Sequence, residues 1–110
     1  MNNDNTFSWQ DYQPEETSHR LIAAYLAVDI QRNIEETNHL LQKIDAVSKR
    51  EIPNWERIGN AYYLRLFPEY AEIEEEFSDE IDQPERIPLP LFKIAVQSWQ
   101  QHISSDTLLK

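Results

Sequence analysis

The stretch that decides the fold is residues 61–77, which read AYYLRLFPEYAEIEEEF. On both sides of Pro68 and Glu69, apolar and polar residues alternate with a period of two, which is the pattern of a half-buried β-strand. A turn at Pro68-Glu69 therefore predicts an antiparallel hairpin with strands at 61–67 and 70–77. A one-residue slip would set leucines against glutamates, so the pattern favours one register. The predicted cross-strand pairs are Leu66–Ala71, Leu64–Ile73 and the opposite-charge pair Arg65–Glu72.

Helical patterns flank this hairpin on both sides. From Pro14 to about Val47 no Gly or Pro interrupts the helical spacing of apolar residues, which predicts one long helix, or two helices if the chain breaks before Asn33. After a predicted loop over 78–90, the spacing predicts an amphipathic helix of about 13 residues. Its apolar line is Phe92, Ala95, Val96, Trp99 and Ile103. We expect Trp99 to be buried, since a tryptophan on such a line covers a large apolar area.

This order of elements predicts an α+β fold. The chain of 110 residues has the length of one ordinary domain, so we expect a single domain over 1–110. Within it we expect residues 1–13 to form an extended arm packed on the domain and residues 104–110 to form a frayed tail.

The negative charge of the chain is concentrated in one segment. Twenty acidic residues oppose ten basic ones, for a net charge of −10. Nine acidic residues and no basic one lie from Glu69 to Glu85, so the rest of the chain holds eleven acids against ten bases. Such a field repels nucleic acid and anionic membrane surfaces, and it attracts a basic protein. No apolar run is long enough to span a bilayer and no signal-peptide pattern is present, so we expect a cytoplasmic protein.

A candidate partner-binding surface follows from the hairpin register and the acidic segment. The register places Tyr63 on the polar face of the hairpin, where an aromatic among charges is a common anchor at protein interfaces. The acidic residues that we expect around it are Glu72, Glu74, Glu76, Asp79, Glu80, Asp82 and Glu85. We expect Glu72 and Glu74 to steer a basic partner and to be dispensable for the fold. The alternative is an acidic surface that only keeps the protein solvated.

The residues that catalysis and metal binding use are sparse. The absence of cysteine excludes thiol chemistry and disulfides, and the single glycine, Gly59, excludes glycine-rich phosphate loops. The pairs Glu16–His19 and Glu36–His39 have the spacing of di-iron bundles, but a continuous helix would hold the two histidines about 30 Å apart. The glutamates at 72–76 step along an exposed strand, where nothing shifts their pKa values apart. We therefore predict that the chain is not an enzyme and has no cofactor and no metal site.

The second half of the chain resembles a known group of small bacterial proteins. The residues that carry the resemblance are Ile52-Pro-Asn-Trp55, Arg57-Ile-Gly-Asn60, Tyr62-x-Leu64-x-Leu66, Ala71-Glu-Ile73, Pro88-Leu-Pro-Leu-Phe92 and Ala95-x3-Trp99. The group includes immunity proteins of contact-dependent growth inhibition systems and YacL-like proteins. The resemblance implies a non-catalytic protein that binds and neutralises a toxin domain, often a nuclease with a basic active site. The alternative is a cytosolic adaptor or homodimeric protein whose acidic face is only solvated.

Overall fold

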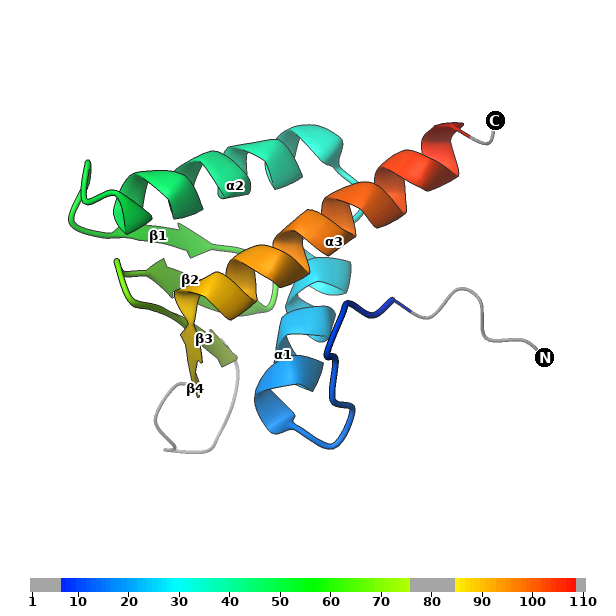
Figure 1. The fold of residues 1–110 in the computed structure, drawn as a ribbon, viewed down its shortest axis with the longest axis horizontal. Helices are drawn as coiled ribbons and strands as arrows, with labels where there is room; N and C mark the ends of the chain where they lie inside the picture. The colour runs from blue at the N-terminus through cyan, green and yellow to red at the C-terminus, as the bar shows by residue number, and fades with distance from the viewer. Residues whose placement is uncertain (1–6, 76–84, 109–110) are drawn as a thin grey trace.

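The structure is a computed structural model that describes residues 7–75 and 85–108, with the side chains of 105–108 left out. Its described part is an α+β domain of three α-helices, one turn of π-helix and a four-stranded antiparallel sheet, as the sequence predicts at the level of fold class (Figure 1). In chain order the elements are α1 Thr17–Tyr25, η1 Leu26–Ile30, α2 Ile34–Ser48, β1 Trp55–Ile58, β2 Tyr62–Leu66, β3 Tyr70–Glu75, β4 Glu85–Pro88 and α3 Leu89–Leu108. None of these helices is long and apolar enough to cross a membrane.

The predicted hairpin is confirmed at the centre of the sheet. Strands β2 and β3 pair in the predicted register, with Arg65 opposite Glu72 and Leu64 opposite Ile73. The N–H of Phe67 donates to the carbonyl of Tyr70 at 2.8 Å, which closes the two-residue turn between the strands. The alternating burial of the two strands confirms that one face is apolar and the other polar.

Two further strands extend this hairpin into a meander in the order β1-β2-β3-β4. The prediction of a loop over 78–90 is wrong at its end, because Glu85–Pro88 form β4 and α3 begins at Leu89. Strand β4 buries only Ile87 among its four side chains, so its sequence gives no alternating signal. Its position comes from the ladder to β3, in which Ile87 pairs with Ala71. Residues 78–84 of the predicted loop lie outside the described residues.

The helices cover the apolar face of the sheet, and α3 crosses in front of it (Figure 1). The predicted apolar line of α3 is confirmed, since all five of its members are buried. Trp99 is 5% exposed, and its Nε1–H donates to the carbonyl of Gln31 at 2.8 Å. α3 runs for 20 residues to Leu108, farther than the sequence predicts, so residues 104–108 continue the helix and 109–110 lie outside the description.

The N-terminal helical region contains a break. A continuous helix from 14 to 47 is wrong, and the alternative of a break before Asn33 is confirmed, because α1 passes into η1 and the chain turns at Gln31. Gln31 has a φ of 62° and a ψ of −159°, a backbone region almost reserved for glycine. The side chain of Asn33 then caps α2 by accepting from the N–H of Glu36 at 3.0 Å. The sequence has no Gly or Pro here, so the local sign of the break is Asn33, a residue type preferred at helix N-caps.

The segment before α1 packs against the helices through aromatic rings. Trp9 is buried, and Phe7 lies edge-on to Trp99 with their ring centroids 5.0 Å apart. Nδ1 of His19 accepts a hydrogen bond from the N–H of Gln13 at 2.9 Å, which ties the end of the segment to α1. Residues 7–13 thus contact the domain as expected for the arm, whereas residues 1–6 of the predicted arm lie outside the description.

Candidate functional site

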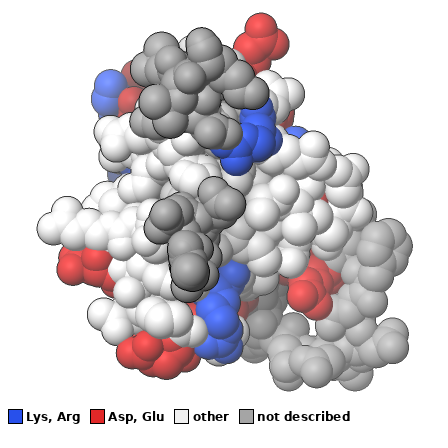
Figure 2. All heavy atoms as spheres, turned by 90° about the vertical axis from the view of Figure 1, so that its right-hand side faces the viewer, with Lys and Arg blue, Asp and Glu red and all other residues white. Residues whose placement is uncertain are grey.

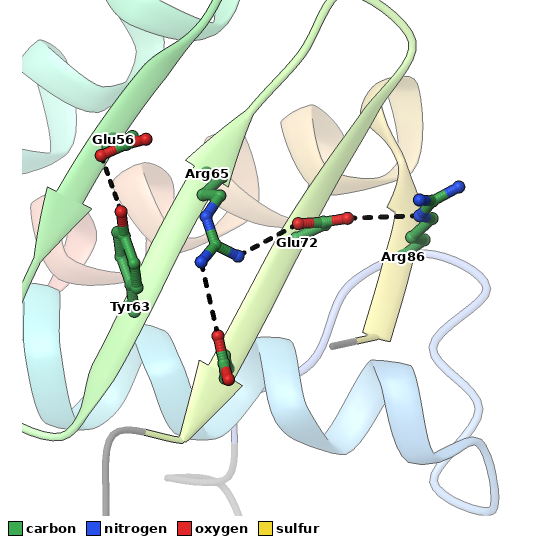
Figure 3. Close-up of polar contacts among 6 residues, drawn as sticks. Glu56, Tyr63, Arg65, Glu72 and Arg86 are labelled. Carbon is green, nitrogen blue, oxygen red and sulfur yellow. Dashed lines mark hydrogen bonds and ion pairs between the residues drawn. The ribbon is translucent and has the colours of Figure 1, made fainter. Parts of the chain in front are cut away.

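The face of the sheet that points away from the helices, here called the outer face, carries polar and aromatic side chains from all four strands (Figure 3). Successive side chains of a strand point to opposite faces, so the residues between the buried ones form this surface. It consists of Glu56 and Ile58 from β1, Tyr63 and Arg65 from β2, Tyr70, Glu72 and Glu74 from β3, and Arg86 and Pro88 from β4.

Three ion pairs cross the outer face, and two of them meet at Glu72. Its Oε1 lies 3.2 Å from Nη1 of Arg65, and its Oε2 lies 3.2 Å from Nε of Arg86. Nη2 of Arg65 lies 3.6 Å from Oε1 of Glu74. The Glu72 side chain is only 12% exposed, whereas that of Glu74 is 43% exposed. Glu72 therefore bridges two arginines in a mostly buried position, whereas we expected an exposed charge.

Tyr63 is held in place on the same face from two sides. Its hydroxyl donates to Oε1 of Glu56 at 2.7 Å, and the guanidinium carbon of Arg65 lies 4.2 Å from its ring centroid. The hydrogen bond to Glu56 raises the pKa of the Tyr63 hydroxyl. The ring is half-buried rather than free in solvent. A side chain fixed in this way loses little further freedom when a partner binds, which is the property of a pre-organised anchor.

A second arginine–tyrosine stack lies toward the opposite end of the face. The guanidinium carbon of Arg86 is 4.8 Å from the ring centroid of Tyr70, whose ring in turn lies 4.9 Å from that of Phe67. The outer face is thus a platform of two arginine–tyrosine stacks joined by Glu72. By contrast, the described atoms on the side of the molecule shown in Figure 2 are mostly uncharged, with a few separate basic and acidic groups among them.

The structure brings together only part of the predicted binding set. Tyr63, Glu72 and Glu74 share the outer face, and Glu85 is exposed at the start of β4, opposite Ile73. The other members, Glu76, Asp79, Glu80 and Asp82, lie outside the described residues. Sequence reasoning missed Glu56, Ile58 and Arg86 as members of this surface. Recognising Trp55–Ile58 and Glu85–Pro88 as strands would have found all three, because the register then follows from alternation.

Residues 76–84, the part of the acidic segment between β3 and β4, are attached to the sheet near Tyr63. Glu75, the last residue of β3, lies opposite Tyr62, and Glu85 opens β4 opposite Ile73. In a meander, this end of the sheet is also the end that carries the turn between β1 and β2. Both attachment points of residues 76–84, in which the sequence places Glu76, Asp79, Glu80 and Asp82, therefore lie at the end of the sheet where Ile58 faces Tyr63.

A buried carboxylate in the helical layer holds that turn. Asp29 is 5% exposed, and its two oxygens accept from the N–H of Ala61 at 3.0 Å and of Tyr62 at 3.1 Å. A Cβ on Gly59 would lie 2.1 Å from Oδ2 of Asp29, so only glycine fits between the turn and this carboxylate. The π-helical turn places Asp29 where an α-helix that continued in register would not. The sequence gives no sign of this contact, since Asp29 follows an apolar run.

An arginine beneath β1 ties the strand to α2. Nε of Arg57 donates to Oε2 of Glu36 at 2.9 Å, while Nη1 of Arg57 and the hydroxyl of Tyr25 are buried without a hydrogen-bond partner of good geometry in the described part of the chain. Burial is the largest cause that raises the pKa of the Tyr25 hydroxyl. These contacts fix β1 from its inner side, and with it the position of Glu56 and Ile58 on the outer face.

The histidines singled out by the sequence lie against aromatic rings. The ring centroid of His19 lies 5.5 Å from that of Trp9, and the ring centroid of His39 lies 5.8 Å from that of Trp55. Within residues 7–75 and 85–108, no three His, Cys, Asp or Glu side chains are grouped so that they could hold a metal ion.

Neither family models, curated proteins nor solved structures give a match to this chain.

Proposed function

We propose that the chain is a non-catalytic immunity-type inhibitor, which binds and neutralises a basic toxin domain through the outer face of the sheet and the acidic segment joined to it. The observation that carries the proposal is the position of a pre-organised aromatic anchor, Tyr63, at the end of the sheet from which the acidic segment leaves. Anchors of this kind, surrounded by charge, are typical of protein interfaces.

The distribution of charge supports a basic partner. Glu72 and Glu74 are paired with arginines, so they add little net field to the outer face. The exposed carboxylates Glu75 and Glu85 and the acids of residues 76–84 are the source of the attraction. A basic nuclease-type domain would meet this end of the sheet first, because unpaired surface charges steer the encounter of two proteins. The resemblance in residues 52–103 to immunity proteins points to the same class of partner.

The test uses a candidate toxin domain, which we expect to be encoded next to this chain at the end of a large exported protein. Its association with the purified chain is measured at several salt concentrations. We expect the association rate to fall as salt rises, since surface charges are screened over about 8–10 Å. Glu75→Lys should slow association at low salt. Glu51→Lys, an equal charge change ahead of the opposite end of β1, should have little effect.

Tyr63→Ala should act mainly on dissociation, with a loss of about 2 kcal/mol or more of binding free energy if the ring is an anchor. Tyr63→Phe is the matched control that keeps the ring and removes the hydroxyl bonded to Glu56. A rate that is independent of salt, together with parent-like binding by Glu75→Lys and Tyr63→Ala, would refute this interface. In that case the acidic surface only solvates an adaptor or homodimer.

A further inference from the structure

The two open edges of the sheet differ in how they are protected. An edge strand exposes unpaired N–H and C=O groups, and natural proteins guard such edges with proline, charge or short length. Strand β4 ends in Pro88 and carries the exposed charges of Glu85 and Arg86. Strand β1 is equally short and carries the charges of Glu56 and Arg57, but it has no proline, and it ends in Ile58, which is 68% exposed. The end of β1 at Ile58 is thus the less protected part of the two edges.

The hydrogen-bond pattern shows which groups of β1 face outward. The N–H of Gly59 donates to the carbonyl of Tyr62 at 2.9 Å, so these two residues form a hydrogen-bonded pair. Such pairs recur every second residue in an antiparallel ladder. Arg57 and Trp55 therefore bond to β2, whereas the N–H and C=O groups of Glu56 and Ile58 point to the free edge. No residue in the described part of the chain forms a backbone hydrogen bond to them.

We propose that β1 pairs in antiparallel fashion with β1 of a second copy of the chain, about a two-fold axis at Ile58. This register sets the two exposed isoleucines side by side and places each Glu56 opposite Asn60 of the other copy. A register centred on Glu56 would oppose two carboxylates, and one centred on Arg57 would oppose two guanidinium groups. Of the registers centred on Glu56, Arg57 or Ile58, only the one centred on Ile58 sets no like charges against each other at the two-fold axis of an isologous interface.

The consequence is a continuous eight-stranded sheet. Residues directly opposite each other in a ladder point to the same face, so the outer faces of both copies lie on one side. Tyr63, the neighbour of Ile58 on β2, then lies beside the two-fold axis in each copy. A contact along so short a strand buries less than the roughly 1,200 Å² of a stable specific interface. We therefore expect a weak dimer whose population depends on concentration.

The first test uses the absence of cysteine from the chain. In Ile58→Cys any disulfide must join two copies, and directly opposed residues of a hydrogen-bonded pair have Cα atoms about 5.5 Å apart, within disulfide range. Ile94→Cys is the matched control, because Ile94 is also an exposed isoleucine but lies on α3. Under mild oxidation we expect Ile58→Cys to form a covalent dimer at least about tenfold faster than Ile94→Cys. Equal rates for the two variants would overturn the proposal.

The second test leaves the chain free of thiols and follows sedimentation from micromolar to millimolar concentration. We expect the parent to dimerise reversibly and Ile58→Glu to weaken the dimer by about tenfold or more, because it sets two carboxylates at the axis. Glu56→Pro removes an N–H that faces outward and keeps the ladder to β2, so it should weaken the dimer as well. Ile94→Glu should behave like the parent. Circular dichroism checks that each variant folds.

A parent that stays monomeric over the whole range, or an Ile58→Glu variant that dimerises like the parent, would refute self-pairing at β1. These measurements involve no toxin domain. Their outcome is therefore independent of the inhibitor proposed above, which stands or falls on the salt dependence of its association with that domain.

Discussion

On the inner face of the sheet Leu64, Leu66 and Ile73 are at most 1% exposed, whereas on its outer face Arg65, Glu72 and Arg86 form ion pairs at the surface. Burial of apolar area is not directional, so the inner face tolerates volume-conserving apolar substitutions best. The outer face depends on direction, because each carboxylate must meet a particular guanidinium. A substitution on the inner face is thus expected to cost stability in proportion to lost volume, and one on the outer face in proportion to the partners it leaves unpaired.

The largest expected loss of stability comes from truncating a side chain of the core that covers the inner face of the sheet. Trp99→Ala should lower the free energy of unfolding by about 3–5 kcal/mol, since it empties a buried site and removes the donor to the carbonyl of Gln31. Urea unfolding measures the change. Trp99→Phe keeps most of the volume and isolates the hydrogen bond. A midpoint for Trp99→Ala close to that of the parent would show that Trp99 is not part of the core.

The next largest loss is expected at the contact between Gly59 of the sheet and Asp29 of the helical layer. Gly59→Ala should cost about 1–3 kcal/mol, because the added methyl group would collide with the carboxylate of Asp29. Asp29→Ala removes that carboxylate and leaves the N–H groups of Ala61 and Tyr62 without their acceptor. The double variant should lose less than the sum of the two single losses, which chemical unfolding of the four proteins can measure. Strict additivity would mean that the glycine and the aspartate do not share this contact.

A pair of charge reversals sharpens the comparison on the outer face itself. Glu72→Lys should cost about 1–2 kcal/mol, because it places a third cation between Arg65 and Arg86 in a site that is only 12% exposed. Glu74→Lys changes the same charge on the same strand, but its side chain is 43% exposed, so its cost should stay under about 1 kcal/mol. Thermal unfolding at low salt distinguishes them. Equal losses would mean that burial does not separate these two glutamates.

Titration of Tyr63 tests the geometry of the anchor. Its pKa is raised in the folded chain by the hydrogen bond to Glu56, so the stabilisation from this pair is present below the pKa of an unfolded tyrosine and is lost as pH rises through the folded value. Glu56→Gln should therefore lower the pKa of Tyr63. Tyrosinate absorbance, with Tyr63→Phe identifying the signal, measures it. An unchanged titration would place the Tyr63 hydroxyl away from Glu56.

The smallest expected loss of stability concerns an ion pair between α2 and α3, which belongs to neither face of the sheet. The hydrogen bond from Nζ of Lys93, at 2.9 Å, lowers the pKa of Asp45 and links α3 to α2. Its contribution is present above the pKa of an unfolded aspartate and is lost as pH falls through the lower, folded value. Both side chains are more than two-fifths exposed, so Lys93→Met should cost only a few tenths of a kcal/mol at neutral pH. The difference from the parent should vanish in strong acid.

The sequence by itself determined the central hairpin, its register and the helix that covers it. Alternation along 61–77 requires only local information, because a strand shows its two faces in its own side chains. The line from Phe92 to Ile103 is equally local, and burial confirmed all of its members. The pairing of Arg65 with Glu72 followed from the same register.

Only the tertiary structure decided the edges of the sheet, the break at Gln31 and the role of Glu72. Strands of four residues such as β1 and β4 are too short to show a period, and they form because a neighbouring strand supplies their hydrogen bonds. Gln31 takes its unusual backbone conformation where its carbonyl accepts from Trp99, which is 68 residues away in the sequence. The sequence predicts one partner for Glu72, Arg65, and the second ion pair, with Arg86, forms only because β4 pairs with β3. The contacts at Gln31 and Glu72 join residues that are 68 and 14 positions apart in the chain, and local pattern carries no record of such contacts.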